Sequence, residues 1–281
     1  MSSRSFWSIA AVFTAVACTG EPTPTTDTAA DTAAKDTGAP PVLSPSDLAN
    51  GSENIALVPS IVETQRAMEA AGITTQLAVL IGEKPYDLNN DNKDNVAVRS
   101  GVIIANLLLT VKDSKKEQLQ DQLTKIRAGM STLEGGSDID AMLADIEDRV
   151  KGDSVTRDDL LKEFDQLSGA VIPELEFNGQ KRIVPLIQAG SWLQGANLVA
   201  KAVKKEGKPE AADSMLKQPA VVDYFIQYVK NEGSEKAPAA ITEKLAESLT
   251  TLKGLAEKKE PFTNEDIDLV IKTTDDVLAL L

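Results

Sequence analysis

The sequence predicts an all-α protein: a single globular bundle of about ten helices with two almost fully buried central helices, preceded by a disordered tether. From about residue 50 onward, apolar residues recur at three- and four-residue spacing, which is typical of amphipathic helices. Alternating β-branched runs bounded by hairpin turns, the usual signal of strands, do not occur. Two segments of helical length are apolar on nearly every face, as expected of helices at the centre of a fold.

The first 17 residues have the pattern of a signal peptide. Arg4 supplies a positive charge, residues 6–16 are mostly apolar, and Ala15-Val16-Ala17 provides the small residues that precede a cleavage site. Cys18 follows directly and is the only cysteine of the chain. Because Ala-Val-Ala-Cys is a loose version of the bacterial lipoprotein signal, we expect Cys18 to carry lipid and to hold the protein to a membrane.

The N-terminal segment has two alternative interpretations. Ordinary cleavage after Ala17 would export the protein with a free thiol at Cys18. A transmembrane anchor is disfavoured because the apolar stretch is shorter than the roughly 20 residues that cross a bilayer. Thr19, in place of an aspartate, favours the outer membrane in bacteria that use the aspartate retention rule.

Residues 18–45 are rich in Thr, Ala, Asp and Pro and contain almost no bulky apolar side chains. Such a segment buries too little surface to offset its ordering entropy, so we expect a disordered tether with an r.m.s. span of roughly 30 Å. The predicted organisation is therefore a signal peptide (1–17), the lipidated tether (18–45) and a helical domain (46–281).

Capping residues, glycines and prolines predict where the helices begin and end. Gly72 is expected to end the first helix and Ser137 to open another. Thr156 with Asp159 resembles a capping box, and Pro173 is expected to bend or shorten the helix that follows. The expected helices cover residues 59–72, 75–81, 95–112, 115–133, 138–150, 156–175, 182–205, 209–216, 219–231, 239–258 and 264–281.

The two central helices are expected at residues 95–112 and 182–205. In the first, only Arg99, Ser100 and Asn106 interrupt a run that ends VIIANLLLTV. The second is apolar around much of its circumference, and Gly190 and Gly195 would allow a neighbouring helix to approach closely.

Composition excludes several classes of function. The chain has no histidine, so Ser-His-Asp, Cys-His and histidine-based zinc sites are excluded. Its net charge of −14 would repel phosphate backbones, and we expect no nucleic-acid partner. Carboxylate pairs, a Ser-Lys pair or a metal held by Asp and Glu would still allow catalysis, but none has a recognisable motif here. We therefore expect a protein without enzymatic activity and without a cofactor.

Three segments together resemble a group of all-helical bacterial envelope lipoproteins: PSIVE at 59–63, AVRSGVIIANL at 97–107 and AGSWLQGANLVA at 189–200. Members of this group share, in this order, a Pro-Ser-x-x-Glu helix start, a Gly-x-x-x-Ala-Asp-Leu helix and an Ala-Gly-Gly-Trp-x-Glu-Gly segment. The resemblance covers residues 57–203 and implies a helical fold and an envelope location, but no chemistry. Asn106 and Gln194 stand where the group has Asp and Glu, so carboxylate chemistry at these positions is in doubt.

The polar residues within these segments allow two interpretations. The first is a buried polar network that fixes how the central helices meet, because buried polar groups need partners. The second is a site for a small ligand. The candidate residues are Glu63, Arg99, Asn106, Trp192, Gln194 and Asn197, with Trp192 expected in the core.

The loop PYDLNNDNKDN weakly resembles a calcium-binding loop, since Asp87, Asn89 and Asp91 match the first three ligand positions of an EF-hand. Asn92 stands in place of the required glycine, and Val98 in place of the bidentate glutamate. We expect a turn-forming polar loop here and no metal site.

The sequence leaves two functions open. The first is a non-enzymatic scaffold or interaction protein, held to the membrane through Cys18 and presenting its surface to an envelope partner. The second is a module that binds a small ligand between the two central helices. A cavity of several hundred Å³ lined by residues 102–109 and 186–198 would favour the second function, and a filled core the first.

Overall fold

The computed structural model describes residues 61–82, 86–236 and 239–281, and every regular element in these segments is a helix, as predicted. The predicted signal peptide, Cys18, the tether and the domain up to residue 60 lie outside the described residues. The α-helices of the described segments are α2 (Ile61–Ala70), α3 (Lys93–Thr110), α4 (Lys116–Thr132), α5 (Ser137–Lys151), α6 (Arg157–Phe177), α7 (Val184–Glu206), α8 (Asp213–Leu216), α9 (Pro219–Lys236), α10 (Ala239–Ala256) and α11 (Asn264–Leu278). Three 3₁₀ turns connect some of them: η1 (Leu77–Leu80), η2 (Lys181–Ile183) and η3 (Pro209–Ala212).

Side-chain caps from Asn92, Thr156 and Thr263 start α3, α6 and α11. Asn92 accepts hydrogen bonds from the backbone N–H groups of Asp94 and Asn95 at 3.1 and 3.2 Å, which starts α3. Thr156 accepts from the Asp159 N–H at 3.2 Å, so the predicted N-cap of α6 is present. Such caps satisfy backbone donors that the first helical turn leaves unpaired.

Several helices differ from the sequence-based expectation. The helix expected over 75–81 is only the 3₁₀ turn η1, and α9 continues to Lys236 instead of ending at residue 231. α6 is not shortened at Pro173 but continues to Phe177; Pro173 removes one backbone donor, and the exposed Gly169 four residues earlier leaves its carbonyl open to water. Ser137 is the first residue of α5 and not its cap, because Gly136 adopts a φ of +95° there. The single helix expected over 209–216 is the η3 turn followed by the four-residue α8.

The two predicted central helices, α3 and α7, cross at two glycines. A Cβ atom built on Gly101 would lie 2.0 Å from the Ile187 carbonyl oxygen, and one on Gly190 would lie 2.0 Å from the Val98 carbonyl oxygen. Both positions therefore require glycine, because the atoms in the way are backbone and cannot move aside. The expectation of a close approach at Gly190 is correct, whereas the matching role of Gly101 was not foreseen.

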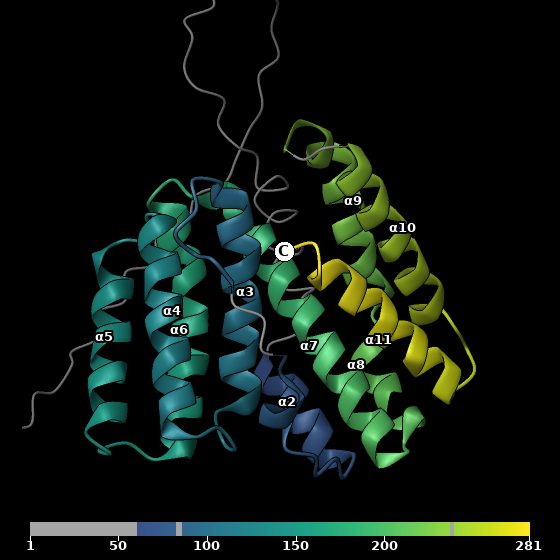
Figure 1. Cartoon of the computed structure of the whole chain (residues 1–281), viewed down its shortest axis with the longest axis horizontal. Coiled ribbons are helices and arrows are strands. Elements are labelled where there is room, and N and C mark those ends of the chain that lie inside the picture. Colours follow the sequence, from purple (N-terminus) through teal and green to yellow (C-terminus); the bar gives the residue numbers. More distant parts are fainter. Residues whose placement is uncertain (1–60, 83–85, 237–238) are drawn as a thin grey trace, which may run out of the picture. The chain divides into compact units, whose positions relative to one another are not determined.

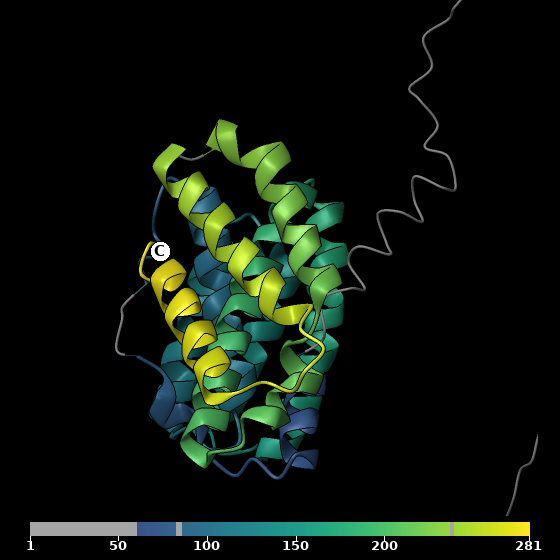
Figure 2. The same ribbon diagram turned by 90° about the vertical axis from the view of Figure 1, so that its right-hand side faces the viewer.

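Two large groups of buried apolar residues lie on either side of this pair. One is formed by α3 to α6 with the start of α7, and the other by the rest of α7 with α2 and α8 to α11. Figure 1 shows α3 to α6 with their axes nearly parallel, while α11 runs along α7 and α10 lies beside α9 and α11. Figure 2 shows the last three helices side by side.

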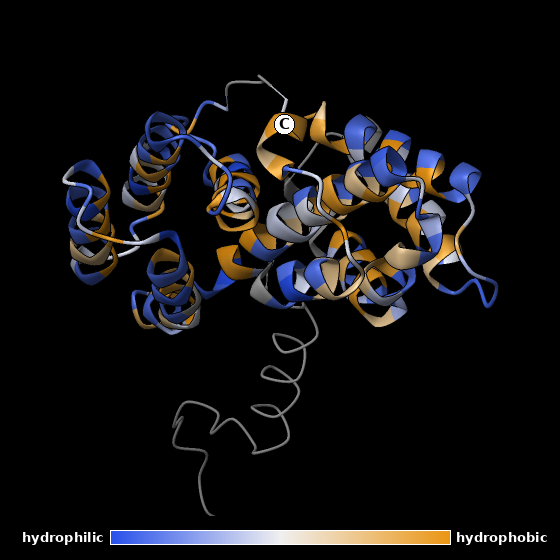
Figure 3. Cartoon of the chain, turned by 90° about the horizontal axis from the view of Figure 1, so that it is seen from below, coloured by the Kyte–Doolittle hydropathy of each residue, from blue (hydrophilic) through white to orange (hydrophobic). Residues whose placement is uncertain are grey.

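The helices turn their apolar faces inward. In Figure 3, hydrophilic residues cover the outer sides of α4, α5, α10 and α11, and hydrophobic residues line the space between neighbouring helices. Burial of these faces is the main contribution to the stability of the fold. Within the part of the chain that the structure describes, no helix is both long and apolar enough to cross a membrane.

Candidate ligand-binding pockets

Asn106 and Gln194 form a buried pair between the central helices. The Gln194 side-chain amide donates from Nε2 to Asn106 Oδ1 at 2.7 Å, and the two residues are only 5% and 7% exposed. A hydrogen bond inside the core satisfies groups that would otherwise be costly to bury. The structure therefore brings together the two positions at which this chain departs from the pattern it resembles.

Asn197 lies on a different side of α7 and contacts α11. Its Nδ2 group donates to Thr274 Oγ1 at 2.8 Å and to Asp275 Oδ1 at 2.9 Å, and Asp275 also pairs with Lys201 at 2.9 Å. Asn197 is 2% exposed, so this group joins the centre of α7 to the last helix.

Arg99 forms hydrogen bonds with partners other than these. Arg99 donates from Nε to the Leu281 carbonyl at 2.6 Å and from Nη1 to the Asp87 carbonyl at 2.8 Å, which joins α3 to the last residue and to the loop before it. Glu63 is exposed on α2. The pair of Asn106 and Gln194, the contacts of Asn197 and those of Arg99 are thus separate sets of hydrogen bonds and not the one network that was expected, because the positions on α7 face different neighbours.

The loop before α3 uses its polar side chains to form turns. Asp87 accepts from the Asn89 N–H at 3.0 Å, and Asn90 accepts from the Asn92 N–H at 2.8 Å. Such Asx turns shape a loop without any ion. Asp91 is exposed, and no cluster of three or more Asp and Glu residues suited to a metal ion is found in the described segments.

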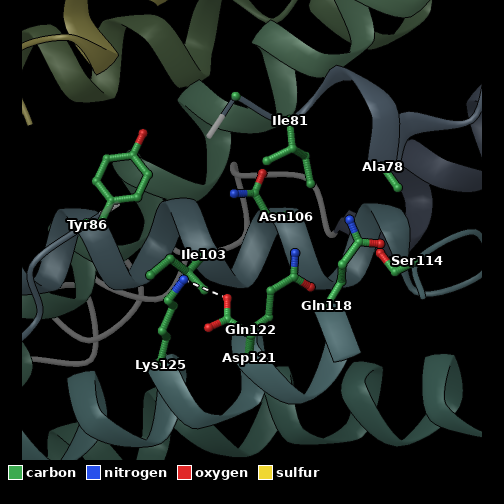
Figure 4. A pocket seen from close by; sticks show the side chains of 11 residues that line it. Ala78, Ile81, Tyr86, Ile103, Asn106, Ser114, Gln118, Asp121, Gln122 and Lys125 are labelled. Carbon is green, nitrogen blue, oxygen red and sulfur yellow. Dashed lines mark hydrogen bonds and ion pairs between the residues drawn. The ribbon is translucent and has the colours of Figure 1, made fainter. Parts of the chain in front are cut away.

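A first pocket of about 290 Å³ lies between α3, α4 and the segment that carries η1. We call it the polar pocket; Figure 4 shows that the Asn106 side chain reaches it from α3, while the side chains of α4 reach it from the opposite side. Burial raises the pKa of Tyr86, which lies at one end. It is lined by Ala78, Ile81, Gly82, Tyr86, Ile103, Asn106, Ser114, Gln118, Asp121, Gln122 and Lys125.

A second pocket of about 270 Å³ lies between α7, α9, α10, α11 and the start of α3, and its lining is mainly large apolar side chains. We call it the apolar pocket. Trp192 lines it, packs against Phe225 with ring centroids 5.6 Å apart, and donates from Nε1 to Gln218 Oε1 at 3.1 Å. Trp192 is half-buried, so it is a wall of this pocket as well as part of the core.

Neither pocket is lined by both residues 102–109 and residues 186–198, the lining expected of a ligand site between the central helices. The contact at Gly101 and Gly190 closes the interface at that crossing. The polar pocket takes its walls from α3, α4 and the segment that carries η1. The apolar pocket takes most of its walls from α7 and the last three helices, and Asp94, Asn95 and Val98 at the start of α3 complete it, so it contacts both central helices.

The residues of α4 that line the polar pocket were not foreseen. Gln118, Asp121, Gln122 and Lys125 recur at three- and four-residue spacing, which places them on one face of the helix. That spacing is readable in the sequence, but a polar helix face is ordinarily exposed to solvent. Only the position of the η1 segment, which is 35 residues or more away in the sequence, turns this face into a pocket wall.

Comparisons with protein-family models, with curated proteins and with solved structures find no match to this chain. The resemblance to helical envelope lipoproteins therefore stays a prediction. The two pockets are the structural features that bear on function.

Proposed function

We propose that this protein is a lipid-anchored envelope protein that binds a small, mostly apolar molecule in the apolar pocket. The observation that supports this most directly is the lining of that pocket: Trp192, Leu193 and Phe225 meet leucines of α10 around an unfilled volume of about 270 Å³. Binding sites for small molecules are typically concave and apolar with a few polar groups. The proposal includes no catalytic step.

The ligand chemistry follows from the distribution of side chains in this pocket. Aliphatic and aromatic residues of α7, α9, α10 and α11 form most of the walls, whereas Asn92, Asp94 and Asn95 come from the start of α3. Asp94 is paired with Arg182 at 2.7 Å, so its charge is compensated. A neutral molecule with an apolar body and one polar end fits this lining.

The volume limits the size of the ligand. At ~30 Å³ per water-sized atom, the apolar pocket holds roughly nine non-hydrogen atoms. A short-chain alcohol such as 1-octanol has this size, an apolar chain and one uncharged polar end, and is therefore a suitable probe.

The test is calorimetric titration of the full chain carrying Cys18→Ser, which prevents acylation, with 1-octanol. We expect saturable binding, and at least a tenfold loss of affinity, about 1.4 kcal/mol, in Ala189→Phe, which places a ring in the pocket. The matched control is Ala141→Phe, which adds the same ring at an exposed position of α5. Unsaturable uptake of octanol, or equal affinity in both variants, would contradict the proposal.

The lipid anchor is tested separately. Intact-mass measurement of the protein extracted from membranes of its own cells should show a chain that begins at Cys18 and carries the added mass of acyl groups. An unmodified Cys18 would remove the anchor from the proposal and leave the ligand pocket unaffected.

One observation favours the scaffold as a second candidate. Phe177, at the end of α6, is 85% exposed, which is unusual for a large aromatic side chain and suits contact with a partner. A partner that copurifies stoichiometrically from native membranes should be lost in Phe177→Ser and retained in Val79→Ser, a matched change at another exposed apolar residue. Loss in both variants, or in neither, would argue against this contact.

A further inference from the structure

The polar pocket contains amide groups whose orientation is set by hydrogen bonds elsewhere in the protein. Asn106 Oδ1 accepts from Gln194, so the Nδ2 group of Asn106 is turned away from Gln194. Figure 4 shows this amide at the centre of the pocket, with its nitrogen on the side of Tyr86. The Nδ2 group donates no hydrogen bond to another described residue and keeps some accessible surface in the pocket, although Asn106 as a whole is 93% buried. It is therefore a donor that a ligand in the pocket can use.

A second amide is held in the same manner. Gln118 Oε1 accepts from the Lys115 backbone N–H at 2.9 Å as part of the N-terminal cap of α4. Its Nε2 group is therefore free to donate to the pocket; Gln118 is an exposed residue, so this group lies at the solvent side of the pocket, opposite Tyr86 in Figure 4. Two fixed N–H donors thus face the same volume from two helices.

The pocket also offers a third amide nitrogen and a hydroxyl oxygen. Figure 4 shows the Gln122 nitrogen turned toward Asn106, while its Oε1 is buried and has no hydrogen-bond partner among the described residues. Ser114 donates its hydroxyl hydrogen to Thr110 Oγ1 at 2.8 Å, and Thr110 in turn donates to the Asn106 carbonyl at 2.7 Å, so the Ser114 oxygen retains lone pairs that can accept. A molecule that satisfies this pocket must both donate and accept.

The charged side chains found in the pocket wall pair with each other. Lys125 and Asp121 form an ion pair at 2.6 Å, drawn as a dashed line in Figure 4, and among the described residues that line the pocket no other side chain is formally charged. A charged ligand would lose hydration without gaining a free counter-charge. A neutral ligand avoids that cost.

From these contacts we infer that the polar pocket is a second binding site, which takes a small neutral molecule bearing amide groups. The carbonyl oxygens of the ligand accept from Asn106 Nδ2, Gln118 Nε2 and Gln122 Nε2, and its N–H groups donate to Ser114 Oγ. The pocket volume of about 290 Å³ corresponds to roughly nine or ten non-hydrogen atoms at ~30 Å³ each. Ile81 and Ile103 provide apolar walls for the carbon skeleton of the ligand.

N-acetylalaninamide is the probe, because it has this size, no charge and two amide groups. The full chain carrying Cys18→Ser is titrated while the ¹H–¹⁵N resonances of the side-chain amides of Asn106, Gln118 and Gln122 are followed. We expect these signals to shift saturably, with a Kd of roughly 1–10 mM as is typical of a ligand this small. N-acetylalanine, an anion, and alaninamide, a cation, should bind at least about tenfold more weakly.

Two variants test the contacts. Asn106→Leu should weaken binding of the probe about tenfold or more, and Gln122→Leu, on the face of α4 that lines the pocket, should do the same without affecting the core. Gln120→Leu is the matched control, because Gln120 is on the same helix but does not line the pocket. Ala189→Phe, in the apolar pocket, should not change binding of this probe.

Several results would overturn the inference. These are the absence of a saturable shift at ~100 mM probe, equal binding of either charged analogue, and unchanged binding in Gln122→Leu with Gln120→Leu as reference. Loss of probe binding in Ala189→Phe would place the probe in the apolar pocket and would also exclude the polar pocket. Octanol binding in the apolar pocket does not depend on any of these outcomes.

Discussion

The two faces of α7 differ in how tightly they pack. Toward α3, Gly190 lets backbones come so close that no Cβ atom fits. Toward α9, α10 and α11, the neighbouring residue Ala189 lines a pocket of about 270 Å³. Gly190 therefore lies in a tight helix–helix contact, whereas the adjacent Ala189 lies at a pocket.

The difference shows how side-chain size determines where a helical bundle can hold a ligand. Small residues at a crossing allow helix axes to approach and leave no space between them. Where Trp192 and Phe225 meet leucines instead, the helices stay further apart and their rigid side chains do not fill the volume between them. Four changes test this comparison, from the largest expected effect to the smallest.

The closed face should tolerate no added atom. Gly190→Ala places a Cβ atom 2.0 Å from the Val98 carbonyl oxygen, so we expect a loss of at least about 3 kcal/mol of unfolding free energy, at the upper end for overpacked cores. Urea denaturation followed by circular dichroism measures it. Gly254→Ala, on α10, meets nothing within 4 Å and should be neutral or stabilise by about 0.5–1 kcal/mol. Similar midpoints for the two variants would show that α3 and α7 are not in close contact.

The polar contact between α7 and α11 should be the next most sensitive. Asn197→Ala removes a buried hydrogen bond to Thr274 and a partly buried one to the Asp275 carboxylate, and should cost about 2–3 kcal/mol. Lys201→Ala removes a partly exposed ion pair to the same carboxylate and should cost less than about 1 kcal/mol. Equal costs in urea denaturation would mean that Asn197 is solvated and that α11 is not firmly packed on α7.

The open face should accept an added side chain. Ala189→Leu places apolar atoms in the apolar pocket, so we expect a change of unfolding free energy between zero and about 1 kcal/mol in the stabilising direction. The melting temperature, compared directly with that of Gly190→Ala, measures it. If Ala189→Leu lowers the unfolding free energy by more than about 1.5 kcal/mol, the volume of the apolar pocket is already filled.

The end of α7 provides a pH-dependent contact. Hydrogen bonds from the Thr74 backbone N–H and from Thr75 to the Glu206 carboxylate lower its pKa from 4.5 to about 2. The folded state is therefore stabilised by ionised Glu206 above about pH 5, and this contribution is lost as the pH falls toward 2. Glu206→Gln should lower the melting temperature at pH 7, and the difference from the native protein should vanish near pH 2. A difference that is constant with pH would show that the contact does not depend on charge.

Much of the fold could be predicted from local signals. The spacing of apolar residues identified α3 and α7 as the central helices, and Thr156 and Gly72 marked helix ends that the structure has. These features depend on a few neighbouring residues, since helix periodicity and capping are local properties of the backbone. For the same reason the sequence predicted that Gly190 lies at a close contact.

Only the tertiary structure decided which surfaces enclose a pocket. Asn106 and Gln194 were recognised as candidates, but their pairing, the separation of Asn197 toward α11 and the role of Gln122 depend on which helices become neighbours. The physical reason is that a pocket is volume left unfilled by residues far apart in the sequence. Its shape depends on interaxial distances, which are set by the packing of whole helices and not by the pattern along any one of them.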